Sequence, residues 1–143
     1  MRIQSSSDHF LVSLARGDDV VASITKACAD RDVGHAWVQG MGAIEQVTVG
    51  AYSFESRTYV REDLPGGWEL LSLNANFGWA DGEPVLHPHV VISDMQNQVR
   101  GGHLFAAKVH VTLEVIVWTG AERLERVLNE DIGLKLWNLP EED

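Results

Sequence analysis

Only one segment of the chain has the apolar spacing of a long helix, and this restricts the fold more than any other feature. Within residues 19–32, apolar side chains recur three and four positions apart, at Val20, Val21, Ile24, Ala27 and Cys28. That spacing predicts one amphipathic helix with one buried face. Asp18 directly precedes this segment and is predicted to cap the helix. A single amphipathic helix must bury its apolar face against another layer, which the rest of the sequence must supply.

The other apolar segments have the short runs and two-residue alternation of β-strands. Strands are expected at residues 9–15, 35–39, 44–54, 57–60, 68–77, 85–93 and 103–118. Residues 64–67 (Leu-Pro-Gly-Gly) are predicted to form a turn, and the tail from Glu122 fits either a helix or an edge strand. The sequence thus predicts an α+β fold, a mainly antiparallel sheet with one principal helix packed on it. Its 143 residues, without linker or repeat, predict a single domain over residues 1–143.

The charge of the chain argues against several classes of partner. With 11 Lys and Arg against 21 Asp and Glu, the formal net charge is −10, and protonating all six histidines still leaves −4. Binding to nucleic acid or to an anionic membrane surface needs clustered basic residues, and no such run occurs. No apolar stretch of about 18 residues is present, so no membrane span is expected. Because Cys28 is the single cysteine and no signal peptide pattern occurs, we expect a buried thiol and a cytoplasmic location.

Three of the six histidines lie close together in the sequence. His87 and His89 are separated by one proline, and His103 follows two glycines. In a strand, side chains two positions apart point to the same face, with α-carbons about 6.5–7 Å apart. Two imidazoles at that separation can bind one metal ion through nitrogen atoms. His87 and His89 are therefore candidate ligands.

The third ligand follows from strand register. A hairpin of residues 85–93 and 99–107 centred on Gln96 places His103 directly opposite His89, on the same face. A turn shifted by half a residue, or a bulge at Gly101-Gly102, would separate them. A site of three imidazoles with an open fourth position is typical of catalytic zinc, although manganese, iron or nickel also fit these ligands. Hydrogen-bonded histidines on a polar strand face are the alternative interpretation.

Glu114 is a further candidate residue, since it lies in the apolar run of residues 111–117. A carboxylate in such a run either pairs at an interface or supports a functional site. In an unbroken strand Glu114 would point away from the face of His103, so we predict an interface or supporting position and not a ligand.

Six short motifs, in order along the chain, resemble one known family. They are Arg16–Asp19, Val38–Ala43, Glu69–Leu73, Gly82–His89, Gly101–Leu104 and Thr112–Val115. Together they resemble the PPC domain (plants and prokaryotes conserved), over about residues 8–138. The resemblance implies a PPC-like α+β fold that forms a homotrimer, with the histidine cluster near subunit boundaries. It also implies metal-ligand roles for His87, His89 and His103.

Two functions and one further family remain open at this stage. The leading hypothesis is a small homotrimer that binds a divalent metal, zinc first, through the three histidines; if it is an enzyme, the chemistry is metal-assisted. The alternative is an oligomeric regulatory or interaction module with a protein partner. The PPC family is often labelled DNA-binding, but in plant members an AT-hook supplies the DNA contact, and this chain has no Arg-Gly-Arg-Pro motif. A cupin-like metalloprotein is the second fold considered, because Gly82, His87, His89 and Gly101 come near the first cupin motif, while the second is missing.

Overall fold

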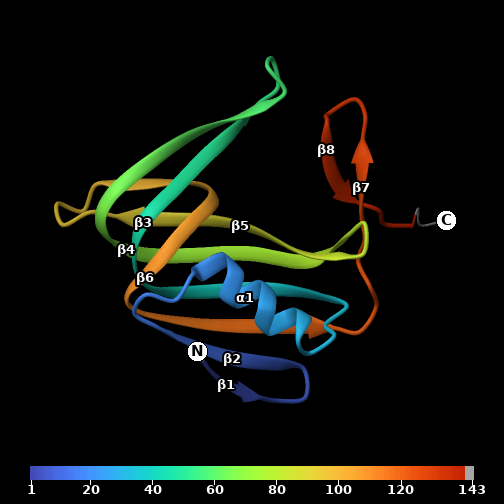
Figure 1. The fold of residues 1–143 in the computed structure, drawn as a ribbon, viewed down its shortest axis with the longest axis horizontal. Coiled ribbons are helices and arrows are strands. Elements are labelled where there is room, and N and C mark those ends of the chain that lie inside the picture. Colours follow the sequence, from blue (N-terminus) through green and yellow to red (C-terminus); the bar gives the residue numbers. More distant parts are fainter. Residues whose placement is uncertain (141–143) are drawn as a thin grey trace.

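Eight strands and one helix make up the part of the chain that the computed structural model describes, residues 1–140 (Figure 1). The elements in chain order are β1 (Arg2–Ser5), β2 (His9–Ala15), α1 (Val20–Ala29), β3 (His35–Ser53), β4 (Thr58–Ala80), β5 (Glu83–Ser93), β6 (Val99–Gly120), β7 (Arg126–Asn129) and β8 (Leu134–Trp137). No helix within residues 1–140 is long and apolar enough to span a membrane.

Strands β1 to β6 form one antiparallel sheet in the order β1-β2-β6-β3-β4-β5. The first part of β6 also pairs with β5, so that β3, β4, β5 and β6 close on themselves at one end of the sheet. Strands β7 and β8 form a separate antiparallel hairpin (Figure 1). The fold is therefore mostly antiparallel sheet, with less helix than a balanced α+β protein would have.

Helix α1 confirms the predicted helix and covers one face of the sheet. Its buried residues are Val20, Ile24, Ala27 and Cys28, which join the hydrophobic core. The cap is Asp19 and not Asp18: the Asp19 Oδ1 accepts a hydrogen bond from the Ala22 N–H at 2.9 Å. The Asp18 carboxylate accepts instead from the Ala15 N–H at 3.0 Å and pairs with the N-terminus.

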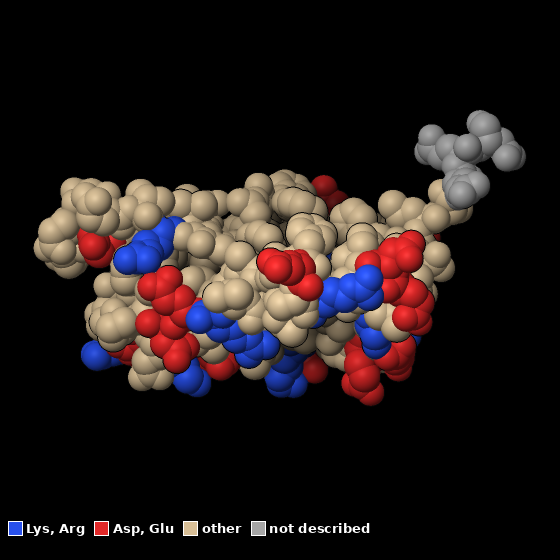
Figure 2. Space-filling model, turned by 90° about the horizontal axis from the view of Figure 1, so that it is seen from above, with Lys and Arg blue, Asp and Glu red and all other residues tan. Residues whose placement is uncertain are grey.

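Side chains alternate between the two faces of the sheet along the central strands. Val38 and its cross-strand partners Ala75 and Val117 are buried on the face that α1 covers. One position along, Trp37 and Trp118 point to the other face and keep 45% and 43% of their surface exposed. We call this second side the open face. Figure 2 shows charged side chains gathered along one side of the molecule and mostly uncharged residues along the opposite side.

Strands β3 and β4 are longer than the sequence predicts, because each has a bulge where we expected the strand to end. The strands predicted at residues 35–39 and 44–54 are parts of one strand, β3, which ends at Ser53 and has irregular pairing between Gly40 and Gly42 and between Glu45 and Val47. Residues 57–60 and 68–77 both belong to β4, which runs through the predicted turn at residues 64–67. Gly66 has φ +83°, a backbone conformation that glycine adopts readily. The extra residues of this bulge bend the strand without reversing it.

The two ends of the chain also differ from the sequence-based picture. Strand β1 was not predicted. The tail, which fitted either a helix or an edge strand, forms strands and not a helix within residues 122–140: β7 and β8 pair as a hairpin.

Candidate metal centre

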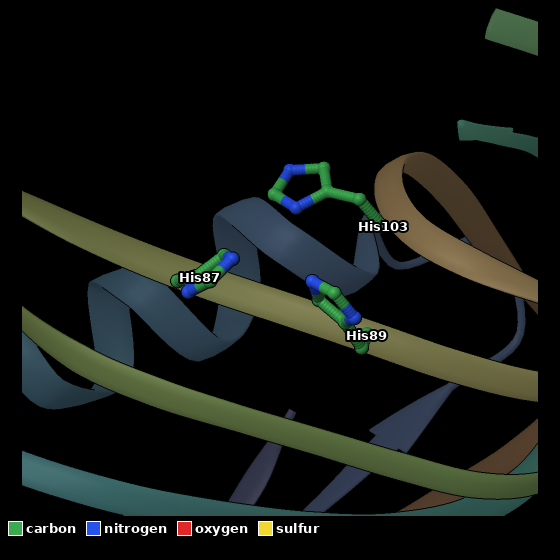
Figure 3. A group of neighbouring side chains, drawn as sticks. All are labelled: His87, His89 and His103. Atoms are coloured by element: carbon green, nitrogen blue, oxygen red, sulfur yellow. The ribbon is translucent and has the colours of Figure 1, made fainter. Parts of the chain in front are cut away.

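The β5–β6 hairpin positions all three candidate histidines. His87 and His89 stand two residues apart on β5, and His103 on β6 is the direct cross-strand partner of His89. The register predicted from a hairpin centred on Gln96 is therefore confirmed. Figure 3 shows His103 reaching from β6 toward the two β5 side chains.

The three imidazoles are close enough to hold one ion. One ring nitrogen from each lies within 4.8 Å of the others, the only such group of three or more His, Cys, Asp or Glu side chains within residues 1–140. The ring centroids are 5.0 Å apart for His87 and His89, 5.2 Å for His87 and His103, and 5.4 Å for His89 and His103. Two nitrogens bound to one zinc would lie about 3.4 Å apart, so small side-chain rotations complete the site. The Nδ1 of His103 is buried without a hydrogen-bond partner, which also suits a ligand atom.

The two glycines before His103 allow β6 to pass closely between its neighbours. A Cβ on Gly101 would lie 2.6 Å from the Val90 carbonyl oxygen, and one on Gly102 would lie 2.8 Å from that of Gly50. Any side chain at either position would push β6 away from β5 or β3. The glycines thus fix the close approach that brings His103 to His89.

Burial keeps two of the imidazoles neutral. The pKa of His87 is lowered to about 4, first by burial and then by the charges of Arg126 and His89. The pKa of His103 is lowered to about 4, first by burial and then by His87, His89 and Arg61. A neutral imidazole has a free lone pair, which is the form that binds a metal ion.

Other residues surround the cluster that the sequence did not indicate. The rings of Tyr59 and Phe105 lie 5.1 and 4.6 Å from the His103 ring, centroid to centroid. The Arg126 Nη2 lies 3.3 Å from the His87 Nδ1 and donates to the Asn76 Oδ1 at 2.6 Å. Arg126 comes from β7, far along the chain, and no spacing rule could have connected it with β5.

Glu114 lies away from the three histidines. It is exposed on the open face, in a shallow groove of about 940 Å³ whose lining includes Leu11, Gln39, Met41 and Leu71. It does not belong to the histidine cluster, and its predicted interface position stays a prediction.

Cys28 is fully buried in the core, as expected. Burial raises the pKa of its thiol to about 12, so it stays protonated and is unsuited to act as a nucleophile.

This geometry defines a class of protein: an antiparallel-sheet protein with three histidines gathered on one β-hairpin. The sequence model of the Plants and Prokaryotes Conserved (PCC) domain matches residues 1–120. The chain therefore belongs to this family. It is the same family as the PPC domain, which the six sequence motifs resemble. None of the curated proteins matches the sequence. The family match decides against the cupin alternative.

Solved structures share the fold over nearly the whole chain. A PPC protein of Pyrococcus horikoshii is 28% identical with a TM-score of 0.86, covering 98% of this chain and 96% of its own. A metal-containing protein of Archaeoglobus fulgidus is 30% identical with a TM-score of 0.85, covering 96% of this chain and 97% of its own. A candidate DNA-binding protein of Bacteroides thetaiotaomicron has a TM-score of 0.92 at 21% identity, with 96% of both chains covered, and is similar in fold.

Proposed function

We propose that this protein binds one divalent metal ion per chain through His87, His89 and His103. Zinc is the ion that we expect. The observation that carries the proposal is the approach of three imidazole nitrogens within 4.8 Å on one hairpin. Three imidazoles with an open fourth position are the usual ligand set of catalytic zinc. The Archaeoglobus fulgidus relative, described as metal-containing, supports the same assignment. If the site is catalytic, the ion would activate water or polarise a carbonyl or phosphoryl oxygen.

Metal analysis of protein purified without a histidine tag tests this proposal. After reconstitution and desalting, the wild type should retain about one equivalent of zinc per chain, and His87→Ala/His89→Ala should retain less than about a tenth. The matched control is His9→Ala/His110→Ala, which also removes two imidazoles and should keep the metal, since His9 and His110 pair with Asp8 and Glu45 outside the cluster. A wild type that stays below a tenth of an equivalent would contradict the proposal.

A homotrimer is the assembly that we propose for the protein, on the basis of its family. The open face supports an interface, because exposed apolar side chains gather beside the groove: Leu11, Trp37, Met41, Leu71 and Trp118. Contiguous exposed apolar surface of this kind usually marks a contact with another protein. Light scattering on the eluting protein tests it, and a stable monomer at micromolar concentration would contradict it.

A regulatory or interaction module is the second candidate function. It is favoured by the Bacteroides thetaiotaomicron relative, which is described as a candidate DNA-binding protein. The net charge of −10 argues that a partner protein, and not this domain, would contact the DNA. A titration with duplex DNA at low salt should therefore show no binding. Tight binding with a steep salt dependence would instead establish direct DNA contact.

A further inference from the structure

We infer that Arg126, which contacts His87 of the three-histidine site, binds a small oxyanion, a carboxylate or a phosphate group. This rests on the proposed metal site and adds a ligand class to it. Three observations carry it: the burial of Arg126 without an anionic partner, its contact with His87, and the absence of negative charge in the cluster.

Arg126 is a buried cation whose partners are all neutral. Only 9% of the residue is exposed. Its Nη2 donates to the Asn76 side-chain oxygen at 2.6 Å and its Nη1 to the Lys135 carbonyl oxygen at 3.1 Å. Its Nε is buried with no partner, and no ion pair joins Arg126 to a carboxylate within residues 1–140.

Other arginines of the chain show what is unusual about this one. Arg100 pairs with Glu62 and Arg123 with Asp32, and each of these two arginine side chains is about half exposed. A charge taken out of water costs free energy unless an opposite charge compensates it. A guanidinium has five N–H donors, so Arg126 still has donors to offer after its present contacts.

The guanidinium lies directly against the cluster. Its Nη2 is 3.3 Å from the Nδ1 of His87, and Asn76, which holds the same nitrogen, is the cross-strand partner of His87. An oxyanion that contacts Arg126 is therefore placed beside His87, one of the three proposed ligands. The planar fork of arginine suits carboxylate and phosphate groups, which accept two parallel hydrogen bonds.

The charge balance of the site favours an anion. Three neutral imidazoles leave a divalent ion with its full charge, and Arg126 adds one more. A second guanidinium, that of Arg61, stacks on the Phe105 ring at 3.8 Å from its centroid, on the side of His103. The group of metal-binding side chains contains no carboxylate within the described residues. One oxyanion between the ion and Arg126 would offset part of this positive charge.

The walls of the site limit what the anion can carry. Tyr59 and Phe105 lie 5.0 Å apart, centroid to centroid, and both pack beside His103. These rings form an aromatic, weakly polar surface next to His103. A small carboxylate or phosphate compound suits this position better than a polyanion.

Calorimetry on zinc-loaded protein tests the inference, with inorganic phosphate and acetate as separate probes in a chloride buffer. Wild type should bind at least one of the two, and Arg126→Gln should weaken binding about tenfold or more, the loss expected for a charge-assisted hydrogen bond. The matched control is Arg123→Gln. This substitution removes an exposed arginine just before the β7–β8 hairpin, and it should change the anion affinity less than twofold. The probe that binds more tightly identifies the oxyanion as phosphate or carboxylate.

Metal content and folding are measured on the same samples, so that the causes can be separated. The inference is overturned if Arg126→Gln keeps about one equivalent of zinc and an unchanged anion affinity. It is also overturned if the wild type binds neither probe. Both outcomes leave the metal site intact. If the wild type holds no zinc, the metal proposal fails. The role of Arg126 is still supported in that case if the metal-free wild type binds an oxyanion and Arg126→Gln abolishes this binding. If Arg126→Gln fails to fold, Arg126→Lys takes its place, with the charge kept and the fork lost, and weaker anion binding is expected. Affinity equal to wild type in Arg126→Lys likewise overturns the inference.

Discussion

The two faces of the sheet use the same strands for different purposes. On the face beneath α1, residues such as Leu73 and Val117 are almost completely buried and hold the fold together. On the open face, one residue away along the same strands, Trp37, Asn76 and Trp118 are partly or largely exposed, and Asn76 borders the histidine cluster. Because strand side chains alternate, the stability of one face constrains the other little. Substitutions should therefore separate folding from binding.

The largest expected effect tests the covered face. Leu73 is 1% exposed and Leu71, on the same strand, is 51% exposed. Leu73→Ala should lower the free energy of unfolding by about 2–5 kcal/mol, because it opens a cavity in the core. Leu71→Ala should lower it by less than about 1 kcal/mol. Urea denaturation followed by tryptophan fluorescence measures both, and equal losses would show that the open face also carries the fold.

The next effect tests the cluster. His103→Ala removes one of three proposed ligands and should weaken zinc binding at least about a hundredfold, more than the loss of a residue that only supports a ligand. The midpoint of unfolding without metal should stay close to wild type, since His103 is not part of the hydrophobic core. Competition with a chromogenic chelator measures the affinity. Unchanged zinc affinity would remove His103 from the site.

A smaller effect tests the groove. Met41 is 62% exposed and is the cross-strand partner of Glu114. Met41→Glu places a second carboxylate beside Glu114, so we expect association of the subunits to weaken about tenfold or more, because the charge would be buried at the interface without a partner. Met41→Leu is the control, and light scattering over a dilution series is the measurement. Unchanged association in Met41→Glu would exclude the groove from the proposed trimer interface.

The last prediction is a pH dependence of the stability of the metal-free protein. Burial lowers the pKa of both His87 and His103 to about 4 in the folded protein, against 6.5 for an ordinary histidine. The unfolded chain therefore takes up protons first, so the stability due to these groups is complete above pH 6.5 and is lost as the pH falls toward 4. Urea midpoints between pH 7 and 4 should fall more steeply for wild type than for His87→Ala/His103→Ala. Parallel curves would contradict the buried, neutral state of the two rings.

The sequence predicted what local spacing and register determine. The helix within residues 19–32 and the pairing of His89 with His103 both follow from short-range patterns, and both agree with the structure. The bulge at Gly66 was predicted as a turn, because Pro-Gly favours either one and only pairing with β3 decides between them. Arg126 could not be placed at all, since its contact with His87 joins strands that do not pair with each other.

The hairpin site also determines the order in which the centre can assemble. All three histidines lie between residues 87 and 103, so closing one local loop brings them together. Local contacts form quickly, while the long-range pairing of β6 with β2 and β3 is slower. If the proposed metal site forms, its three ligands can therefore meet before the rest of the sheet is complete. Arg126 emerges later in synthesis, so the proposed anion position would be completed after the three proposed ligands have met.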